Sequence, residues 1–355
     1  MSEESRFERW VVLLAGGIGS RFWPASTPRR PKQLLPLASG RPLIVDTMER
    51  ARALTDASRV LIVAGEHLRS HLESHFPDLA QDQLLLEPQA RGTAPALAWA
   101  ASEIIARAER TEQAVMVSLN TDHVIRPLGD FVSTLELAVE AAGDLGRLLT
   151  VGIRPDRPET DYGYIEVGER LTPGVFEVRR FVEKPDKETA TGYLARGGFL
   201  WNSGMFVWRP QLLLAELDAR TPELAGELEH LAEGEVAEFF EHAPTLTIDY
   251  GLMERSPNIA VVEAEFEWDD VGAWTALLRV RECDAQGNLL TGDAHAVDCQ
   301  DSLIWAEDGP VVAYGASDLV IVRASGITFV APRERALELK QLLADLPEDL
   351  RSGDD

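Results

Sequence analysis

A glycine-rich segment follows the first apolar run of the chain and leads into two basic side chains. Residues 10–14 are apolar, residues 15–20 read AGGIGS, and Arg21 and Lys32 come next. Glycines let backbone N–H groups approach a phosphate chain closely, and the two cations suit the same negative charge. We therefore predict a nucleoside triphosphate site over residues 15–32.

The spacing differs from that of the two commoner glycine-rich phosphate loops. A Walker loop needs Gly-Lys-Ser/Thr at its end, and a dinucleotide-binding loop needs a third glycine where Phe22 stands. A tight turn that uses Gly16, Gly17 and Gly19 for backbone reasons alone is the alternative. The proline-containing, basic continuation to residue 33 favours the phosphate site.

Two carboxylates follow strand-like apolar runs in distant parts of the chain. Asp122 comes shortly after residues 114–118, and Asp270 closes the stretch Glu267-Trp268-Asp269. A single carboxylate at such a place is more often a turn or cap residue. Two oxygen ligands from separate strand ends, together with substrate phosphates and waters, suit Mg²⁺.

Together these stretches resemble the signature of the sugar-nucleotide pyrophosphorylases. The form GGxGxRxWPxS, the PKQ that follows and the later WxDVGxW look most like the mannose-1-phosphate guanylyltransferase branch, and the resemblance spans nearly all of residues 10–280. The resemblance implies transfer of GMP from GTP to α-D-mannose 1-phosphate, with GDP-mannose and pyrophosphate as products. It also implies Mg²⁺ as the cofactor and a homodimer as the assembly.

The resemblance assigns roles to individual residues. In the catalytic set, Arg21 and Lys32 hold the triphosphate, Asp122 and Asp270 hold Mg²⁺, and Lys184 holds the incoming phosphate. The nucleophile is an already ionised phosphate oxygen, so alignment and charge neutralisation replace a general base. Two neighbours of the metal residues carry no assigned role: Asp269 is the variable position of its motif, and Thr121 stands where the family commonly has alanine.

The segment from Glu87 to Pro95 lies between a predicted strand and a predicted helix. By itself it predicts an ordinary loop, with Thr93 as the helix N-cap and Pro95 in the first turn. In the family the matching stretch LEPxxRNTAP lines the guanine pocket, and Gly92 here replaces its asparagine. The resemblance therefore gives a nucleotide-binding set of Ala15, Gly16, Gly17, Gly19, Ser20, Arg21, Glu87, Pro88, Gly92, Thr93 and Ala94.

Three later residues are the sugar-binding candidates. Gly163 leaves room for a sugar ring, Glu183 offers an acid for vicinal hydroxyls beside Lys184, and the amide of Asn202 both donates and accepts hydrogen bonds. Taken singly, each could belong to a solvated face or a turn. Their order and their intervals of about twenty residues match the family.

A separate histidine pattern also invites a metal interpretation. His67, His71 and His75 recur every fourth residue, so they share one helix face. No HExxH frame or carboxylate–histidine pairing supports zinc there, and a polar helix surface is the preferred interpretation.

The elements that must position these residues alternate between strands and helices. Apolar runs at 10–15, 60–64, 83–86 and 114–119 alternate with helical patterns at 42–54, 66–76, 94–110 and 130–145. This alternation predicts an α/β, Rossmann-like fold with a mostly parallel sheet, which by resemblance is of the nucleotidyltransferase (GT-A-like) type. Ligands of such sheets lie beyond the carboxyl ends of the strands.

The pattern of predicted strands and helices changes twice in the second half of the chain. Strand-like runs at 162–167, 175–183 and 199–208 and helical pieces at 186–196, 210–217 and 247–255 indicate an insertion for the second substrate. From residue 287, short β runs recur roughly every eight to ten residues, and residues 332–346 have helical spacing. We expect a catalytic domain over 1–284 and a small β-rich, β-helix-like domain with a closing helix over 285–355.

Composition narrows the class of protein. The net charge of −25 argues against nucleic acid or an anionic membrane surface as a partner. Cys283 and Cys299 form no metal or disulfide pattern, and no apolar run approaches a membrane span. We expect a cytoplasmic enzyme.

Two alternatives stay open at this point. One is another hexose-1-phosphate nucleotidyltransferase, because sequence does not display the geometry that selects the sugar. The other is a catalytically silent regulatory subunit that binds nucleotide, although such a subunit has no need of all five catalytic candidates. A fused isomerase domain is not expected, since only about 70 residues follow Gln286.

Overall fold

The computed structural model describes residues 6–17 and 19–352. By compactness the chain divides into two units, each assembled from several segments. Unit 1 comprises the residues up to Gly16, Thr47–Asn120 and Ile125–Trp268, and unit 2 comprises Gly17–Asp46, Thr121–Val124 and the residues from Asp269 onward. The predicted domain boundary after residue 284 stays a prediction.

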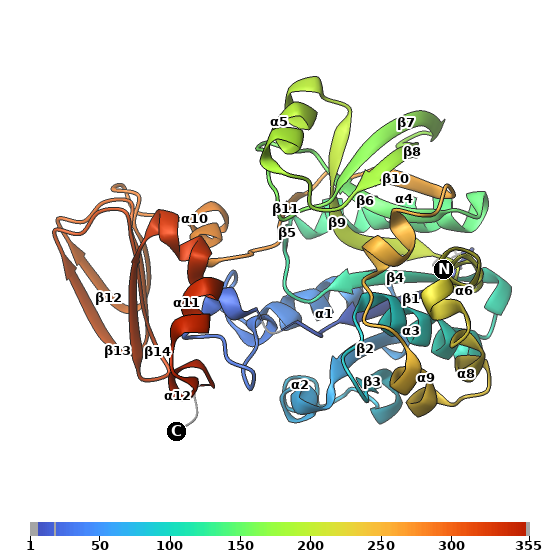
Figure 1. The fold of residues 1–355 in the computed structure, drawn as a ribbon, viewed down its shortest axis with the longest axis horizontal. Coiled ribbons are helices and arrows are strands. Elements are labelled where there is room, and N and C mark those ends of the chain that lie inside the picture. The colour runs from blue at the N-terminus through green and yellow to red at the C-terminus, as the bar shows by residue number, and fades with distance from the viewer. Residues whose placement is uncertain (1–5, 18, 353–355) are drawn as a thin grey trace. The chain divides into compact units, whose positions relative to one another are not determined.

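A nine-stranded sheet forms the centre of unit 1 (Figure 1), in the order β3-β2-β1-β4-β9-β6-β10-β8-β7. Of these strands of the described chain, seven run in one direction and β8 and β9 run against them, which confirms a mostly parallel sheet. The bounds are β1 Glu8–Leu14, β2 Val60–Gly65, β3 Leu84–Glu87, β4 Ala114–Asn120, β6 Leu148–Ile153, β7 Tyr164–Thr172, β8 Val175–Val182, β9 Phe199–Trp208 and β10 Ile259–Glu263.

Helices lie in the connections between these strands. They are α1 Leu43–Leu54, which begins in unit 2 and continues into unit 1, α2 Arg69–His75, α3 Thr93–Arg107, α4 Leu128–Leu145, α5 Lys187–Arg196, α6 Pro210–Arg220, α7 Pro222–Ala225, α8 Leu228–Ala232 and α9 Val236–His242. Successive residues of a strand point to opposite faces, so Trp10 and Val12 of β1 share one core with Leu97 of α3. Helix α4 packs along β4, β6, β9 and β10. Among the helices of the described residues, none has the length and apolar character needed to cross a membrane.

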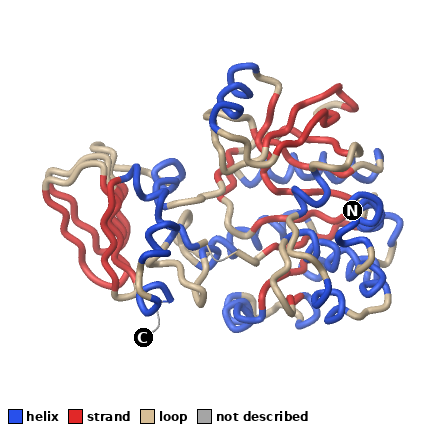
Figure 2. Tube along the Cα trace, in the orientation of Figure 1, coloured by secondary structure: helices blue, strands red, loops and turns tan. Residues whose placement is uncertain are grey.

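Unit 2 contains a four-stranded sheet, drawn in red in Figure 2. Strands β12 Leu289–Val297, β13 Leu303–Tyr314 and β14 Leu319–Ala324 are parallel, and β15 Ile327–Pro332 returns antiparallel. The chain then continues through a 3₁₀ turn, Arg333–Glu338, into α11 Leu339–Asp345 and α12 Glu348–Ser352. The β-rich C-terminal region with parallel strands is thereby confirmed.

The core of unit 2 joins segments that are far apart in the sequence. Phe22 and Trp23 pack with Trp274, Trp305 and residues of the four-stranded sheet. The Trp274 indole N–H donates to the carbonyl of Trp23 (3.0 Å), and the Trp23 indole N–H donates to the carbonyl of Leu350 (3.1 Å). The glycine-rich segment is therefore anchored by residues near the end of the described chain.

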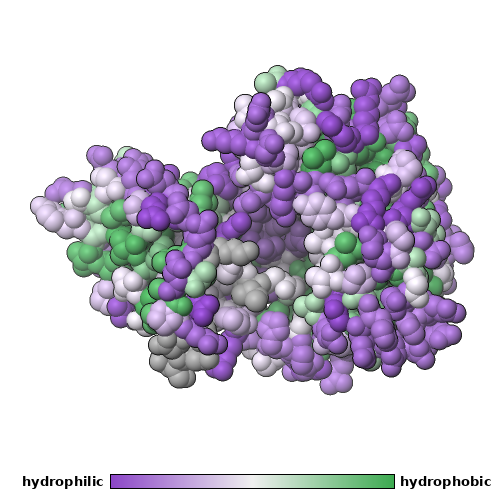
Figure 3. All heavy atoms as spheres, in the orientation of Figure 1, coloured by the Kyte–Doolittle hydropathy of each residue, from purple (hydrophilic) through white to green (hydrophobic). Residues whose placement is uncertain are grey.

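Apolar side chains are exposed on the strands of the C-terminal sheet. On β13, Val312 is 70% exposed and Tyr314 is 77% exposed. Val297 of β12, which pairs with Tyr314, and Val330 of β15 are also exposed. Figure 3 shows hydrophobic residues gathered over this part of unit 2. This face contrasts with the polar surface that covers much of unit 1 in the same view.

Candidate active site

The glycine turn of unit 2 is shaped by Lys32. Gly19 has a left-handed backbone (φ 68°), and a Cβ at this position would lie 2.2 Å from the Cβ of Lys32. A Cβ on Gly17 would meet nothing within 4 Å. The left-handed backbone and the close approach of Lys32 therefore require glycine at position 19. Neither of these reasons applies to Gly17. Ser20 and Arg21, both half-buried, begin the 3₁₀ turn that follows.

Lys32 connects the two predicted metal residues within unit 2. Its side chain is 7% exposed, and its Nζ donates to Oδ2 of Asp122 (2.8 Å) and to the backbone carbonyl of Asp270 (2.5 Å). An ammonium has three donors, and these two contacts occupy two of them. The structure therefore brings Lys32, Asp122 and Asp270 together.

The surroundings of the two aspartates differ. Burial alone would raise the pKa of Asp122, but the charges of Lys32 and then His123 outweigh burial and lower it, so the carboxylate is ionised. Asp270 Oδ1 accepts from the N–H of Gly272 (3.1 Å), and a Cβ on Gly272 would lie 3.0 Å from Oδ2 of Asp270. Oxygen ligands of this kind fit Mg²⁺.

Asp269, the neighbour of Asp270, is engaged differently. Both of its oxygens accept from the Arg279 guanidinium (2.8 and 3.1 Å), and Oδ1 also accepts from the N–H of Val271 (2.8 Å). A buried carboxylate in this bidentate pair stabilises the turn after β11, Glu267–Asp269. This arrangement assigns a structural part to Asp269.

In unit 1, the end of β1 faces a carboxylate at the end of β3. Ala15 donates its N–H to the carbonyl of Val63 (2.8 Å), and a Cβ on Gly16 would lie 3.8 Å from Oε2 of Glu87. Burial raises the pKa of Glu87 to about 7. Glu87 therefore sits close to half ionised at neutral pH, beside the exposed Pro88.

Gly92 is in a conformation that only glycine adopts readily. Its φ of 86° and ψ of 180° fall in the glycine-only region, and a Cβ there would lie 2.6 Å from the carbonyl oxygen of Leu246. The same carbonyl accepts from the N–H of Ala94 (3.1 Å). An asparagine, as in the family motif, would not fit this backbone.

The predicted N-cap at Thr93 is wrong. Helix α3 begins at Thr93, and Gly92 occupies the N-cap position. The Thr93 hydroxyl instead accepts from the N–H of Ile248 (2.9 Å), which ties the loop to a distant segment of unit 1. Pro95 lies in the first turn of α3, as predicted.

The sugar-binding candidates converge within unit 1. A Cβ on Gly163 would lie 2.5 Å from Oε2 of Glu183 and 3.2 Å from Cβ of Asn202. The N–H of Asn202 donates to the carbonyl of Gly163 (2.8 Å), and Lys184 Nζ lies 3.2 Å from Oε1 of Glu183. Three strands and their connections thus place these four side chains and backbones in one small volume.

Glu183 is the electrostatic centre of this cluster. Burial, followed by the nearby Asp249, raises its pKa to about 7 despite the opposing charge of Lys184. Burial likewise raises the pKa of Asp249. Within the described chain, Oε2 of Glu183 is buried and has no hydrogen-bond partner. Because native proteins rarely leave such an oxygen unsatisfied, it suits a hydroxyl of a bound ligand.

Sequence reasoning missed two residues that hold the Asn202 amide. Nδ2 of Asn202 donates to Oδ1 of Asp249 (2.9 Å), and the Thr150 hydroxyl donates to Oδ1 of Asn202 (3.1 Å). Asp249 lies in a π-helical turn, Asp249–Met253. The one sequence feature that could have pointed to Asp249 is its position as a single acid between the apolar Ile248 and the aromatic Tyr250.

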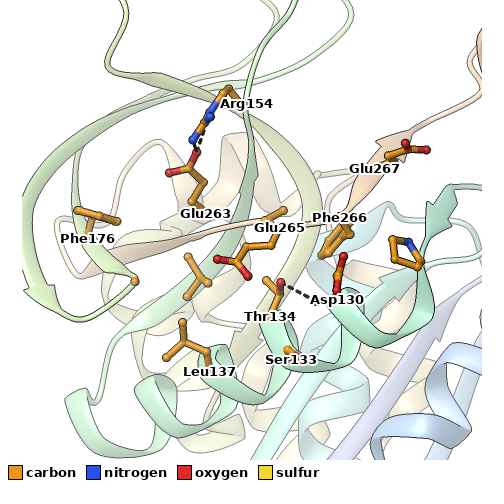
Figure 4. Close-up of a pocket in the computed structure, with 14 residues that line it drawn as sticks. Asp130, Ser133, Thr134, Leu137, Arg154, Phe176, Glu263, Glu265, Phe266 and Glu267 are labelled. Atoms are coloured by element: carbon orange, nitrogen blue, oxygen red, sulfur yellow. Dashed lines mark hydrogen bonds and ion pairs between the residues drawn. The ribbon is translucent and has the colours of Figure 1, made fainter.

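A groove of about 790 Å³ lies elsewhere in unit 1, and none of the predicted site residues lines it. Figure 4 shows α4 along one wall and the ion pair of Arg154 with Glu263 on another, with Phe176 nearby. Its remaining charged lining residues are acidic: Asp130, Glu265 and Glu267. Since its one arginine is already paired, the groove does not suit a polyphosphate.

This chain is similar to several known proteins over nearly its whole length. A mannose-1-phosphate guanylyltransferase of Klebsiella pneumoniae is 35% identical over 96% of this chain and 74% of its own length. The xanthan biosynthesis protein XanB of Xanthomonas campestris pv. campestris is 36% identical over the same shares. A crystal structure from Thermus thermophilus, described as a mannose-1-phosphate geranyltransferase, has 33% identity and a TM-score of 0.86, and the match covers 95% of this chain and 98% of that one.

The resemblance found in the sequence is confirmed by these relatives and by a family match over most of the chain. Residues 10–287 match the model of the family described as nucleotidyl transferase. The match includes every residue that the sequence assigned to binding or catalysis. The chain belongs to the nucleotidyl transferase family.

Proposed function

We propose that this protein transfers GMP from GTP to α-D-mannose 1-phosphate and releases GDP-mannose and pyrophosphate. The observation that carries the proposal is the similarity, over 96% of the chain, to several proteins named mannose-1-phosphate guanylyltransferase. The convergence of the sugar-binding candidates and the Lys32–Asp122–Asp270 cluster support it from the structure.

Recognition of GTP is assigned to the glycine segment and to the loop before α3. Arg21 supplies a cation for the triphosphate, and backbone N–H groups freed of side chains by Gly16 and Gly17 approach it. Glu87 accepts hydrogen bonds from the donor edge of guanine when it is ionised. Gly92 and Ala94 add backbone groups at the same loop.

Mg²⁺ would be held by Asp122 and Asp270 and would offset the charge of the phosphates. Lys32 keeps these two carboxylate segments in place and contributes positive charge of its own. Because Asp122 is held ionised by that ammonium, it needs no deprotonation before it accepts a cation.

Recognition of the sugar phosphate is assigned to the Gly163 cluster. The unpartnered Oε2 of Glu183 accepts a hydrogen bond from a sugar hydroxyl. The amide of Asn202, held in place by Asp249, lies beside Glu183. Lys184, with half of its side chain exposed at 53%, is available for the phosphate of that substrate. In-line attack then needs alignment and charge neutralisation, with no general base.

One experiment separates this proposal from its alternatives. Purified protein is incubated with GTP, Mg²⁺ and each hexose 1-phosphate in turn, and pyrophosphate release is measured. The proposal expects the highest kcat/KM with mannose 1-phosphate and GTP. Preference for another sugar or nucleotide would identify a different nucleotidyltransferase, and nucleotide binding without pyrophosphate release would identify a silent regulatory subunit.

The proposal extends to assembly and compartment. Exposed Val312 and Tyr314 on the C-terminal sheet support self-association as a homodimer, because burial of such side chains against a second copy is favourable. Light scattering of wild type and of Tyr314→Glu tests this, with a monomeric wild type as the contrary result.

The free thiols Cys283 and Cys299 support a cytoplasmic location, which cell fractionation tests.

A further inference from the structure

The short helices α8 and α9 lie close together in unit 1 (Figure 1). Two histidines and a glutamate on or next to these helices come together. One ligand atom from each of Glu227, His230 and His242 lies within 4.8 Å of the others. Among the described residues, this is the one group of three or more such side chains that could hold a metal ion. The group shares no residue with the proposed transferase site.

The two histidines are twelve positions apart in the sequence, and a tight turn brings them together. Gly234 takes a positive φ of 80°, and the N–H of Glu235 donates to the carbonyl of His230 (2.8 Å). The imidazole rings then stack with centroids 6.1 Å apart and an interplanar angle of 20°. Buried Phe239 anchors α9 in the core of unit 1, so the arrangement does not depend on the polar contacts alone.

Hydrogen bonds fix which ring nitrogen of each histidine faces outward. Nδ1 of His230 lies 2.9 Å from Oε2 of Glu235, and Nδ1 of His242 lies 3.0 Å from the carbonyl of Glu238. A carboxylate and a carbonyl only accept hydrogen bonds, so both Nδ1 atoms carry the proton. In the neutral form of each ring, Nε2 is then the nitrogen with a lone pair. Glu227 Oε2 lies 3.8 Å from Nε2 of His230.

This pattern is the one that zinc-binding histidines use. A ligating histidine commonly donates its other N–H to a carboxylate or a backbone carbonyl, which fixes the ring orientation. Two imidazoles and one carboxylate, with water in the open position, form a donor set for Zn²⁺ at about 2.0–2.2 Å. Mg²⁺ prefers oxygen ligands, so it does not suit this group.

We infer that Glu227, His230 and His242 form a Zn²⁺ site in the helical part of unit 1, supported by Glu235 and the carbonyl of Glu238. Ligand atoms of a tetrahedral site lie about 3.3 Å apart at these bond lengths. His242 is exposed, so a modest rotation of its side chain closes the remaining distance. Zn²⁺ at this site links α8 to the end of α9.

The nucleotide loop is attached to that same end of α9. The Arg91 guanidinium donates to the carbonyls of Phe240 (2.9 Å) and Glu241 (2.9 Å), the residues that precede His242. Bound Zn²⁺ therefore restrains the backbone that holds Arg91, without touching substrate. The effect expected is greater thermal stability of unit 1.

The test measures Zn²⁺ binding directly, with chelator-treated full-length protein titrated with Zn²⁺ in excess Mg²⁺. We expect one Zn²⁺ per chain, at least tenfold weaker binding in His230→Ala and in His242→Ala, and 10- to 100-fold weaker binding in Glu235→Gln. His71→Ala/His75→Ala is the matched control, because it removes two histidines of α2 that belong to no group of three or more possible ligands in the described chain.

A second readout identifies the ligands. Co²⁺ in place of Zn²⁺ should give visible absorption of tetrahedral character in wild type, and His242→Ala, an exposed position, should lose it while keeping the circular dichroism of the folded chain. Absence of saturable Zn²⁺ binding, or unchanged binding in both histidine variants, would overturn the proposal. Equal loss in the His71→Ala/His75→Ala control would also overturn it.

Discussion

Replacement of Gly163 by alanine should displace Glu183 more than any other neighbour. The new Cβ would lie 2.5 Å from Oε2 of Glu183, whereas ordinary van der Waals contact begins at 3.4 Å, so the carboxylate must withdraw by about 0.9 Å. Gly163 is not among the glycines with positive φ, so alanine is compatible with its backbone. Misplacement of a binding group by about 1 Å can lower the rate as much as 100-fold.

We therefore expect kcat/KM for the sugar 1-phosphate to fall 10- to 100-fold, which is about 1.4–2.7 kcal/mol of lost transition-state stabilisation. The value of KM for GTP should stay unchanged. Steady-state pyrophosphate release with each substrate varied in turn measures both quantities. Gly192→Ala is the matched control, because its Cβ would meet nothing within 4 Å.

A double variant sharpens this prediction. Glu183→Asp shortens the acid by one methylene and makes room for the alanine, so its effect and that of Gly163→Ala should not add. Strict additivity, or full activity of Gly163→Ala in a folded protein, would show that Glu183 does not contact the sugar substrate.

Three further changes test other parts of the site. The proposed contact with guanine needs ionised Glu87, and burial raises the pKa of Glu87 to about 7. GTP affinity should therefore rise about tenfold from pH 6 to pH 8, and Glu87→Gln should flatten this profile in binding titrations. Asp270→Asn removes the charge of a proposed metal ligand without a change of volume. Turnover should therefore fall by orders of magnitude while the melting temperature is preserved. Near-normal turnover at saturating Mg²⁺ would show that Asp270 does not hold the metal. Gly92→Ala should cost about 1–3 kcal/mol of unfolding free energy for its backbone alone, and more for the overlap with Leu246. Gly197→Ala, with nearly the same dihedral angles (φ 70°, ψ −178°) but open space, measures the backbone part, and equal losses in denaturant titration would refute the overlap.

Most elements of unit 1 were predictable because their apolar periodicity is local. The predicted strand at 114–119 corresponds to β4, and the predicted helix at 130–145 lies within α4. The helical piece at 247–255 is a π-helical turn over Asp249–Met253, a wider winding that apolar spacing does not distinguish from an α-helix. The runs at 302–306 and 311–314 proved to be one strand, β13, although its pairing with β12 shifts register across the residues between them, which apolar spacing does not reveal.

The catalytic and binding candidates could be found from motifs, but their supporting contacts could not. Asp249 and Thr150 hold Asn202 from positions 47 and 52 residues away, and no local pattern links them. Gly92 departs from the family motif, and the structure explains why. A side chain there would overlap the carbonyl oxygen of Leu246, which lies about 150 residues further along the chain. Such contacts follow from tertiary packing and are invisible to a window of neighbouring residues.

The hydrogen bond from Trp23 to Leu350 joins residues that are 327 positions apart, so the two residues leave the ribosome at different times. On a ribosome that adds 5–20 residues per second, Phe22 and Trp23 emerge roughly 20 to 60 seconds before their final partners. During that interval two large aromatic rings next to the glycine segment lack their native cover. The Trp23 indole N–H therefore gains its native acceptor only after Leu350 has been synthesised.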